Sequence, residues 1–190
     1  MIILGVDPGS RLLGYGLIEK SGNSVRVVDH GTLRLFHKEY RDVPVDETTP
    51  SRLKEIHTGL SELILKHHPT VMAVEKVFFS KNAVSALKLG QARGVVLLTG
   101  ALHDLEIHEY AATEVKSRIT GHGRADKEQV AKMLRILLGG QEFETADASD
   151  ALALALAHAL VGQSKTGGRS RNSLKSLAES ALNKGRTLKR

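Results

Sequence analysis

The chain has 190 residues, of which 41% are hydrophobic, and it carries a net charge of +6 and no cysteine. This composition can bury a core, and the lack of cysteine excludes a disulfide framework and a thiolate metal site. The sequence contains no apolar run of membrane-spanning length and does not begin with a signal-peptide pattern, so we expect a cytoplasmic protein with no membrane contact.

The first third of the chain predicts a small antiparallel sheet. Residues 1–6, 14–20 and 25–35 are typical of strands, and short turns containing Gly and Asn join the second and third. A polar loop with proline follows over residues 37–50. Apolar residues then recur with a helical period over 51–68, with Ser51 near the predicted start of that helix.

The middle and last thirds alternate between strands and helices. Residues 70–77 and 107–111 predict strands, and residues 81–102 predict a long helix rich in small side chains. Residues 116–126 read as a basic loop with glycine, followed by helices over 127–138 and 145–161. Asp126 and Gln129 have the spacing of a helix-capping box. This order predicts an α/β fold with a mixed five-stranded sheet, helices on both faces, and adjacent, parallel first and fourth strands.

The positive charge is concentrated at the end of the chain. Residues 164–190 contain eight Lys or Arg and one Glu, so residues 1–163 carry a net charge of about −1. The terminal segment is rich in Ser, Gly and Lys/Arg, which is typical of a disordered or weakly helical arm that binds polyanions. We therefore expect a domain over residues 1–163 and a basic tail over 164–190, which could also serve only for solubility.

Four carboxylates stand inside apolar segments. Asp7 follows the first strand, Glu75 lies near the end of the fourth, and Asp147 and Asp150 share one face at the start of the last helix. If the first and fourth strands are neighbours, Asp7 and Glu75 emerge at the same edge of the sheet. Separate structural roles are the alternative: Asp7 as a turn residue and Asp147 or Asp150 as a helix cap. Glu75 is harder to explain in this way, because Glu is depleted in apolar strands.

Converging carboxylates would repel one another unless cations were bound between them. Ligand sets made only of oxygen suit Mg²⁺ or Mn²⁺, and two such ions are the usual arrangement for phosphodiester cleavage. The four acids therefore predict a site for two Mg²⁺ ions, with Mn²⁺ as a possible substitute. No nucleophile with an adjacent base stands out, which favours attack by a water molecule without a covalent intermediate.

Four stretches of the chain resemble the RuvC family, the bacterial Holliday-junction resolvases with a ribonuclease-H-like fold. They are GVDPGSRLLGYG, AVEKVFFSKNAVSALKLGQARGV, YAATEVKSRITGHGRADKEQV and DASDALALALAHA, which together cover most of residues 1–163. The resemblance implies a homodimer that nicks opposed strands of a four-way DNA junction, leaving 5′-phosphate and 3′-hydroxyl ends, in recombination and repair. It implies catalytic, metal-binding roles for Asp7, Glu75, Asp147 and Asp150, and work alongside the branch-migration proteins RuvA and RuvB.

The resemblance also implies DNA contacts. Phe78 matches the aromatic position that is thought to stack on a junction base, and Lys116 and Lys127 match lysines that face DNA. These lysines bracket a basic, glycine-bearing segment with Arg118 and Arg124, a composition suited to phosphate. A core position for Phe78 and solvated surface positions for the lysines are the structural alternatives.

Two further positions carry weaker signals. His158 lies two helical turns beyond Asp150, where a supporting or core role is favoured over direct metal ligation. Gly90 and Gly94 in the helix over 81–102 would let a second helix approach closely, which suits a dimer seam.

Two other functions fit parts of the sequence. A non-catalytic DNA-binding module would use the basic loop and tail, but it gives no reason for buried acids on three separate elements. The strand–Asp–x–Gly–Ser start also resembles the phosphate loop of actin-like ATPases. That fold requires a second domain and a second glycine-rich phosphate loop, and residues 8–163 supply neither.

Overall fold

The computed structural model describes residues 1–9, 11–35, 45–76, 83–140, 142–143 and 145–161. Its strands form one five-stranded sheet in the order β3-β2-β1-β4-β5. The strands are β1 (Ile2–Asp7), β2 (Leu12–Ser21), β3 (Ser24–Arg34), β4 (Val71–Glu75) and β5 (Glu106–Tyr110). The helices are α1 (Val45–His67), α2 (Ala83–Leu102), α3 (Ala112–Thr120), α4 (Lys127–Leu137) and α5 (Ala146–Ala159).

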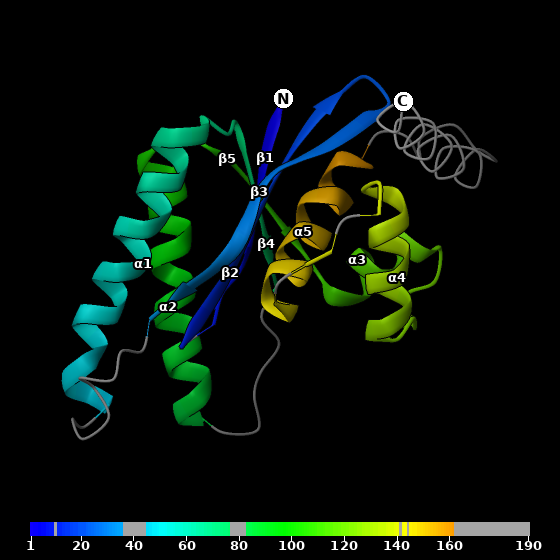
Figure 1. The fold of residues 1–190 in the computed structure, drawn as a ribbon. Coiled ribbons are helices and arrows are strands. Elements are labelled where there is room, and N and C mark those ends of the chain that lie inside the picture. Colours follow the sequence, from blue (N-terminus) through cyan, green and yellow to red (C-terminus); the bar gives the residue numbers. More distant parts are fainter. Residues whose placement is uncertain (10, 36–44, 77–82, 141, 144, 162–190) are drawn as a thin grey trace.

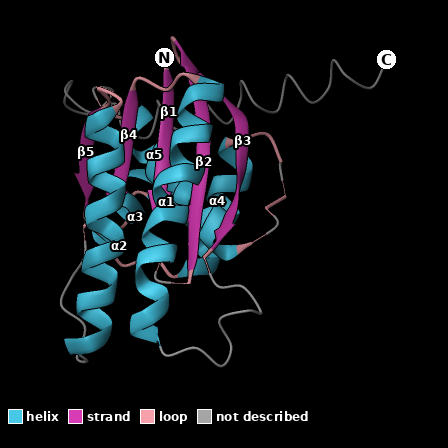
Figure 2. Ribbon diagram, turned by 90° about the vertical axis from the view of Figure 1, so that its left-hand side faces the viewer, coloured by secondary structure: helices cyan, strands magenta, loops and turns pink. Residues whose placement is uncertain are grey.

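The sheet is mixed, as the sequence predicts. β1, β2 and β3 form the antiparallel meander, while β4 runs parallel to β1 and β5 runs parallel to β4 (Figure 2). In the β1–β4 pair Val6 lies opposite Val74. The two strands therefore end at the same edge of the sheet, which confirms the adjacency predicted for the first and fourth strands.

Helices cover both faces of the sheet. α1 and α2 pack on one face, and α3, α4 and α5 lie on the other (Figure 1). The alternation of side chains along β1 follows this division, because Ile3 packs into the core beneath α5 and Leu4 into the core beneath α1 and α2. No helix in the described part of the chain is long and apolar enough to cross a membrane.

α5 lies unusually close to β1 and β2 because three glycines face it. A Cβ on Gly5 would collide with the carbonyl oxygen of Ala151, and one on Gly14 would collide with that of Asp147. A Cβ on Gly16 would lie 2.7 Å from Leu152 Cγ. α5 is buried along Ala151–Ala157, where alanine alternates with leucine. The close packing therefore depends on glycine in the sheet and on small alanine side chains in the helix.

The structure corrects two boundaries. The polar loop predicted over 37–50 is shorter, because α1 begins at Val45 and contains Pro50. Thr48 is 2% exposed, so tertiary burial holds these early turns in place despite the proline. Residues 37–44 lie outside the described part.

The basic segment predicted as a loop over 116–126 begins instead as the second half of α3. The buried Val115 and Ile119 anchor this short helix one turn apart, and it ends at Gly121, whose φ of 82° is left-handed. Two buried apolar residues in a nine-residue helix give only a weak helical period. The Lys and Arg residues in and after this helix make the segment resemble a basic loop, which is why the sequence pattern favours a loop. The predicted Asp126–Gln129 capping box is confirmed at the start of α4.

We expect Gly5→Ala to destabilise the protein because its Cβ would push α5 away from β1. Overpacking of this kind lowers the free energy of unfolding by about 1–3 kcal/mol. Gly90→Ala on α2 is the matched control at a protein concentration that keeps the chain monomeric, since a Cβ there meets open space within one chain and alanine favours helix. Chemical denaturation of both variants measures the difference, and equal stabilities would contradict the close packing of α5.

Candidate active site

Three elements bring acids to one edge of the sheet. Asp7 is the last residue of β1 and Glu75 the last residue of β4, so their parallel strands deliver both carboxylates to the same place. Asp147 and Asp150 lie in the first two turns of α5. Thr145 caps this helix by accepting a hydrogen bond from the Ala148 backbone N–H at 3.1 Å. The convergence predicted from the sequence is therefore present for Asp7, Glu75 and Asp150.

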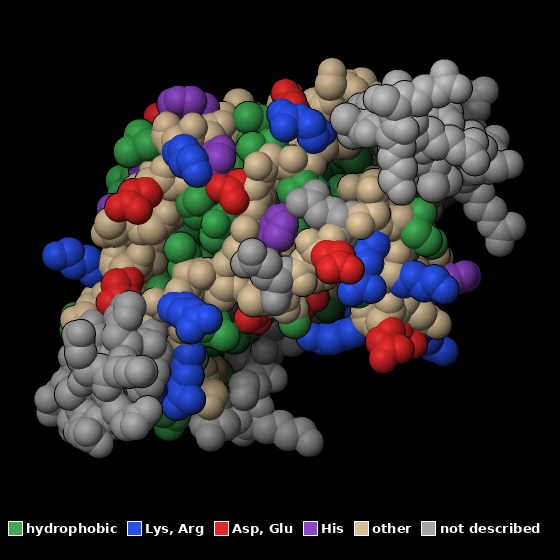
Figure 3. Space-filling view, viewed as in Figure 1, with side chains coloured by type: hydrophobic (Ala, Val, Ile, Leu, Met, Phe, Trp, Pro, Cys, Tyr) green, Lys and Arg blue, Asp and Glu red, His purple; other side chains and the backbone are tan. Residues whose placement is uncertain are grey.

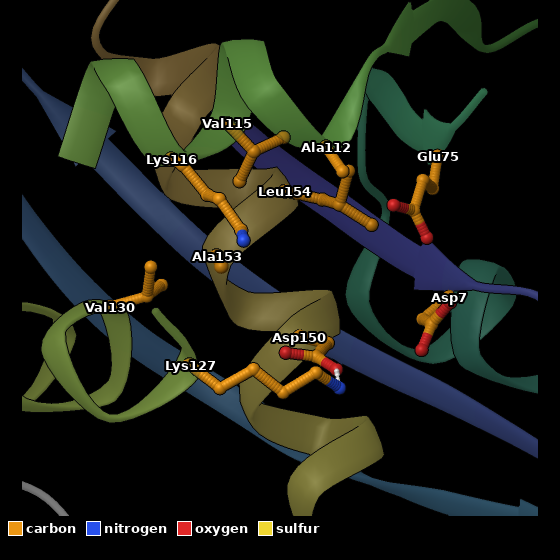
Figure 4. Close-up of a pocket in the computed structure, with 10 residues that line it drawn as sticks. All are labelled: Asp7, Glu75, Ala112, Val115, Lys116, Lys127, Val130, Asp150, Ala153 and Leu154. Atoms are coloured by element: carbon orange, nitrogen blue, oxygen red, sulfur yellow. Dashed lines mark hydrogen bonds and ion pairs between the residues drawn. The ribbon is translucent and has the colours of Figure 1, made fainter. Parts of the chain in front are cut away.

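These three carboxylates line a cavity of about 140 Å³. Lys116 enters it from α3 and Lys127 from α4, whereas Asp7 and Glu75 lie on the opposite side (Figure 4). The remaining walls are apolar and come from α3, α4 and α5: Ala112, Val115, Val130, Ala153 and Leu154. Asp147, in the first turn of α5, does not line the cavity, but its charge contributes to the raised pKa of Asp7.

The cavity holds its acids in an unfavourable state. Burial, with the charges of Glu75, Asp150 and Asp147, raises the pKa of Asp7 from 3.8 to about 7. Burial and the Asp150 charge also raise the pKa of Glu75. Asp7 and Glu75 are therefore destabilised as anions by burial and by the neighbouring carboxylates.

Lys127 gives partial compensation. Its Nζ donates to Asp150 Oδ2 at 3.3 Å, and the Asp150 carboxylate raises the pKa of this lysine (Figure 4). Lys127 also lowers the pKa of Asp7 and Glu75, but the net shift of both remains upward. One lysine is thus insufficient to balance the clustered negative charge.

Divalent cations fit this donor set. The cavity offers carboxylate oxygens from three chain segments and no nitrogen or sulfur ligand, which is the preference of Mg²⁺ and Mn²⁺. As the side chains stand, no group of three or more His, Asp or Glu residues in the described ranges is arranged to hold an ion. The raised pKa values of Asp7 and Glu75 mean that a closer approach of these carboxylates would have to be offset by bound positive charge.

The cations expected to contact DNA divide into two groups. Lys116 and Lys127 line the cavity, and Arg124 is exposed in the turn between α3 and α4. Arg118 is instead occupied within α3, where it pairs with Glu114 at 2.8 Å and lies over the Tyr110 ring. Phe78 lies outside the described residues, as does the basic tail.

His158 lies away from the carboxylates. Its Nδ1 is 2.8 Å from the Tyr110 hydroxyl, and its ring lies 4.5 Å from that of His108. Burial and the neighbouring His108 lower the pKa of His158 to about 4, so the ring is neutral at physiological pH. Its contacts belong to the packing of α5 on β5, and it does not line the cavity.

The support behind Glu75 comes from a residue that the sequence pattern does not single out. The Arg93 Nε on α2 donates to the Glu75 carbonyl oxygen at 3.4 Å, and the Arg93 guanidinium pairs with Glu109 on β5. The Lys76 backbone N–H also donates to the Tyr110 carbonyl at 2.8 Å. Arg93 stands within the GQARGV stretch, but nothing in the linear pattern indicates that it reaches the end of β4.

Comparisons with known proteins agree with this geometry. Residues 3–158 match the family model described as crossover junction endodeoxyribonuclease RuvC. A relative of that name from Citrifermentans bemidjiense is 50% identical over 159 residues, covering 84% of this chain and 92% of the relative. The family-model match includes the residues of β1, β4 and α5 that carry the acids.

Solved structures give the same result. The structure of T. thermophilus RuvC in complex with a Holliday junction substrate matches with a TM-score of 0.73 and 33% identity, covering 84% of this chain and 93% of that one. The yeast mitochondrial Holliday junction resolvase Ydc2 has a TM-score of 0.60 and 14% identity over 94% of this chain and 82% of its own, which shows a shared fold. The chain belongs to the RuvC family of crossover junction endodeoxyribonucleases.

Proposed function

We propose that this protein resolves four-way DNA junctions by nicking opposed strands with divalent cations, as part of DNA recombination and repair. The observation that carries the proposal is the cavity in which Asp7, Glu75 and Asp150 from three elements meet two lysines. Support comes from the 33% identical T. thermophilus relative, whose structure contains a Holliday junction substrate. The bacterial origin of the relatives supports a cytoplasmic location, where chromosomal DNA is accessible.

In the proposed reaction, water attacks a phosphodiester in line with the departing 3′ oxygen. The bond between phosphorus and that oxygen breaks, which leaves a 5′-phosphate and a 3′-hydroxyl. Asp7, Glu75, Asp147 and Asp150 would hold Mg²⁺ ions, and the bound ions would supply an activated water and charge stabilisation for the leaving oxygen. Lys116 and Lys127 lie at the cavity wall, where they can bind the phosphate and orient it against the carboxylates.

The other DNA contacts extend this site. Arg124 is exposed beside the cavity lysines and suits the phosphate backbone, whereas Arg118 would act by keeping α3 in position. Phe78, three residues after Glu75, would stack on a base at the junction centre, and the tail over 164–190 would add affinity without reading sequence. RuvA and RuvB are the partners proposed to deliver the junction.

A DNA-binding module without catalysis accounts less well for the cavity. Such a protein gains nothing from burying mutually repelling carboxylates, which lower stability unless they bind a ligand. An actin-like ATPase is not favoured either, because residues 3–158 match the resolvase family model.

A homodimer completes the proposal, because two opposed cuts require two sites related by symmetry. The outward face of α2 suits the seam. Its exposed apolar side chains include Leu87 and Leu98, which are 64% and 56% exposed, and a Cβ on Gly94 between them would meet open space. A second α2 could therefore approach closely and cover a face that a monomer would leave in water.

Replacing each acid by its amide tests the site. We expect Asp7→Asn, Glu75→Gln, Asp147→Asn and Asp150→Asn to slow junction nicking by about 100-fold or more, because the amides cannot hold or balance the cations. Junction affinity should stay near the wild-type value, since cationic side chains bind the phosphates. Asp104→Asn is the matched control on an exposed turn. Nicking at the wild-type rate by Asp7→Asn would refute the assignment.

The raised pKa of Asp7 predicts how metal-free stability depends on pH. The unfolded carboxyl ionises near 3.8 and the folded one near 7, so wild-type stability falls between these values as pH rises and then levels off. Asp7→Asn removes this loss, and we expect it to be more stable by about 1–3 kcal/mol at pH 8 in chelator. Added Mg²⁺ should raise the Tm of the wild type more than that of the variant. Thermal unfolding from pH 4 to 8 gives both comparisons, and parallel pH curves would contradict the charge repulsion.

Leu98→Glu tests the seam on α2. A charge in the centre of an apolar helix pair is expected to convert the dimer to monomer at micromolar concentration and to uncouple the two nicks on one junction. Leu65→Glu is the control, since Leu65 is an equally exposed apolar side chain on α1 (62%). Light scattering measures the mass of each variant. A monomeric wild type, or a dimer that survives Leu98→Glu, would remove α2 from the interface.

A further inference from the structure

A second groove opens beside the catalytic cavity. It has a volume of about 230 Å³ and runs between α4 and the first turns of α5. Lys127 and Asp150 line both spaces, so the groove begins where the carboxylate cavity ends. Its other lining residues are Ala131, Arg135, Phe143, Thr145, Ala146 and Ser149.

The α4 wall of this groove has a regular composition. Lys127, Ala131 and Arg135 follow one another at four-residue intervals, which puts them on one helix face. The adjoining face of α4 is fixed in the core by Val130 and Leu134. Because eight residues of helix rise about 12 Å, two cations stand at the ends of a trough with a small alanine between them.

Arg135 is available to a ligand. The side chain is exposed, and no hydrogen bond or ion pair joins it to any residue in the described ranges. Other arginines of the domain are occupied: Arg118 pairs with Glu114 and Arg93 with Glu109. Figure 3 shows Lys and Arg side chains gathered over α4 on this side of the molecule.

The facing wall is uncharged apart from Asp150 and carries two hydroxyl side chains. Thr145 and Ser149 lie one turn apart at the start of α5, and Phe143 forms an apolar part of the lining. Phe143 is held in place by edge-to-face contact with His30, with ring centroids 6.0 Å apart. Cations at both ends, hydroxyl groups and an apolar surface are together suited to a length of sugar–phosphate backbone rather than to a compact anion.

We propose that this groove holds the DNA strand next to the scissile phosphate, and that Arg135 binds a backbone phosphate beyond Lys127. This proposal rests on the proposed nuclease function and adds the direction in which the cut strand crosses the site. The cut strand passes from Lys116 in the cavity, across the carboxylates and Lys127, to Arg135 at the far end of the groove. A guanidinium there can bind two oxygens of one phosphate, which fixes the strand in register with the carboxylates.

The test compares Arg135→Ala with Lys132→Ala, which removes an exposed cation from the same helix but lines neither cavity. Arg135→Ala should weaken junction binding about tenfold and flatten the salt dependence by nearly one phosphate contact, about 0.7–0.9 in the log–log slope. Lys132→Ala should change both values less. Arg135→Lys should restore the slope but only part of the affinity, because lysine keeps the charge and loses the paired contact.

Neutral methylphosphonate linkages locate the contact. A single linkage is placed one, two or three nucleotides from the cut, on either side. One position should weaken the wild type and leave Arg135→Ala without further loss, because the partner is already missing. Thermal unfolding of each variant confirms that the fold is kept.

The outcomes separate the two proposals. If the wild type cuts junctions while Arg135→Ala binds and cuts like Lys132→Ala, or no linkage shows the coupled loss, the groove is not the strand path and the nuclease function stands. If the wild type cuts no junction with Mg²⁺ or Mn²⁺, the proposed function fails, and the strand path fails with it.

Discussion

The contact of the α5 backbone with the β1–β2 ladder is the constraint on which the rest of the structure depends. Gly5, Gly14 and Gly16 leave no Cβ between the sheet and the helix, and Gly14 lies opposite Asp7 in the ladder. The first turn of α5 therefore lies against the sheet at the point where β1 ends. A side chain of ordinary size at these positions would move the start of α5 outward, and with it Asp147 and Asp150.

That close approach has an electrostatic cost. It brings acidic side chains of α5 close to those at the ends of β1 and β4 in a partly buried cavity, where the pKa of Asp7 rises to about 7. Moving α5 outward would relieve this repulsion, but it would also expose the buried Ala151–Ala157 segment that packs on the sheet. The proposed cations would offset this repulsion, which Lys127 on Asp150 offsets only in part. Packing thus creates the charge imbalance that makes the proposed metal site favourable.

The two faces of the sheet have separate roles, and a contact at Glu75 connects them. α3, α4 and α5 form the cavity and the groove on one face, and α2 offers its apolar side to solvent on the other. Arg93 crosses this division, because it starts on α2, donates to the Glu75 carbonyl and pairs with Glu109. The end of β4 is therefore held from the helix that carries the proposed dimer seam.

The sequence by itself determined the mixed sheet and the adjacency of its first and fourth strands, and it singled out four acids as candidates, because burial leaves a direct imprint on local pattern. Apolar runs mark β1 and β4, and an acid at the end of such a run is conspicuous since its burial is costly. The resemblance of the quoted motifs to the RuvC family likewise needed no coordinates, and the family comparison confirmed it.

Tertiary structure alone decided what depends on contacts between distant segments. α3 is held by Val115 and Ile119 against the core, a signal too short to read among its basic neighbours. Likewise, Arg93 reaches Glu75 from 18 residues away, and Arg135 borders a groove only because α4 packs beside α5. The near-contact of α5 with three glycines belongs here as well. The sequence contains the glycines, but only the folded chain puts an α5 carbonyl oxygen where a Cβ of Gly5 or Gly14 would stand and the Leu152 side chain where that of Gly16 would stand.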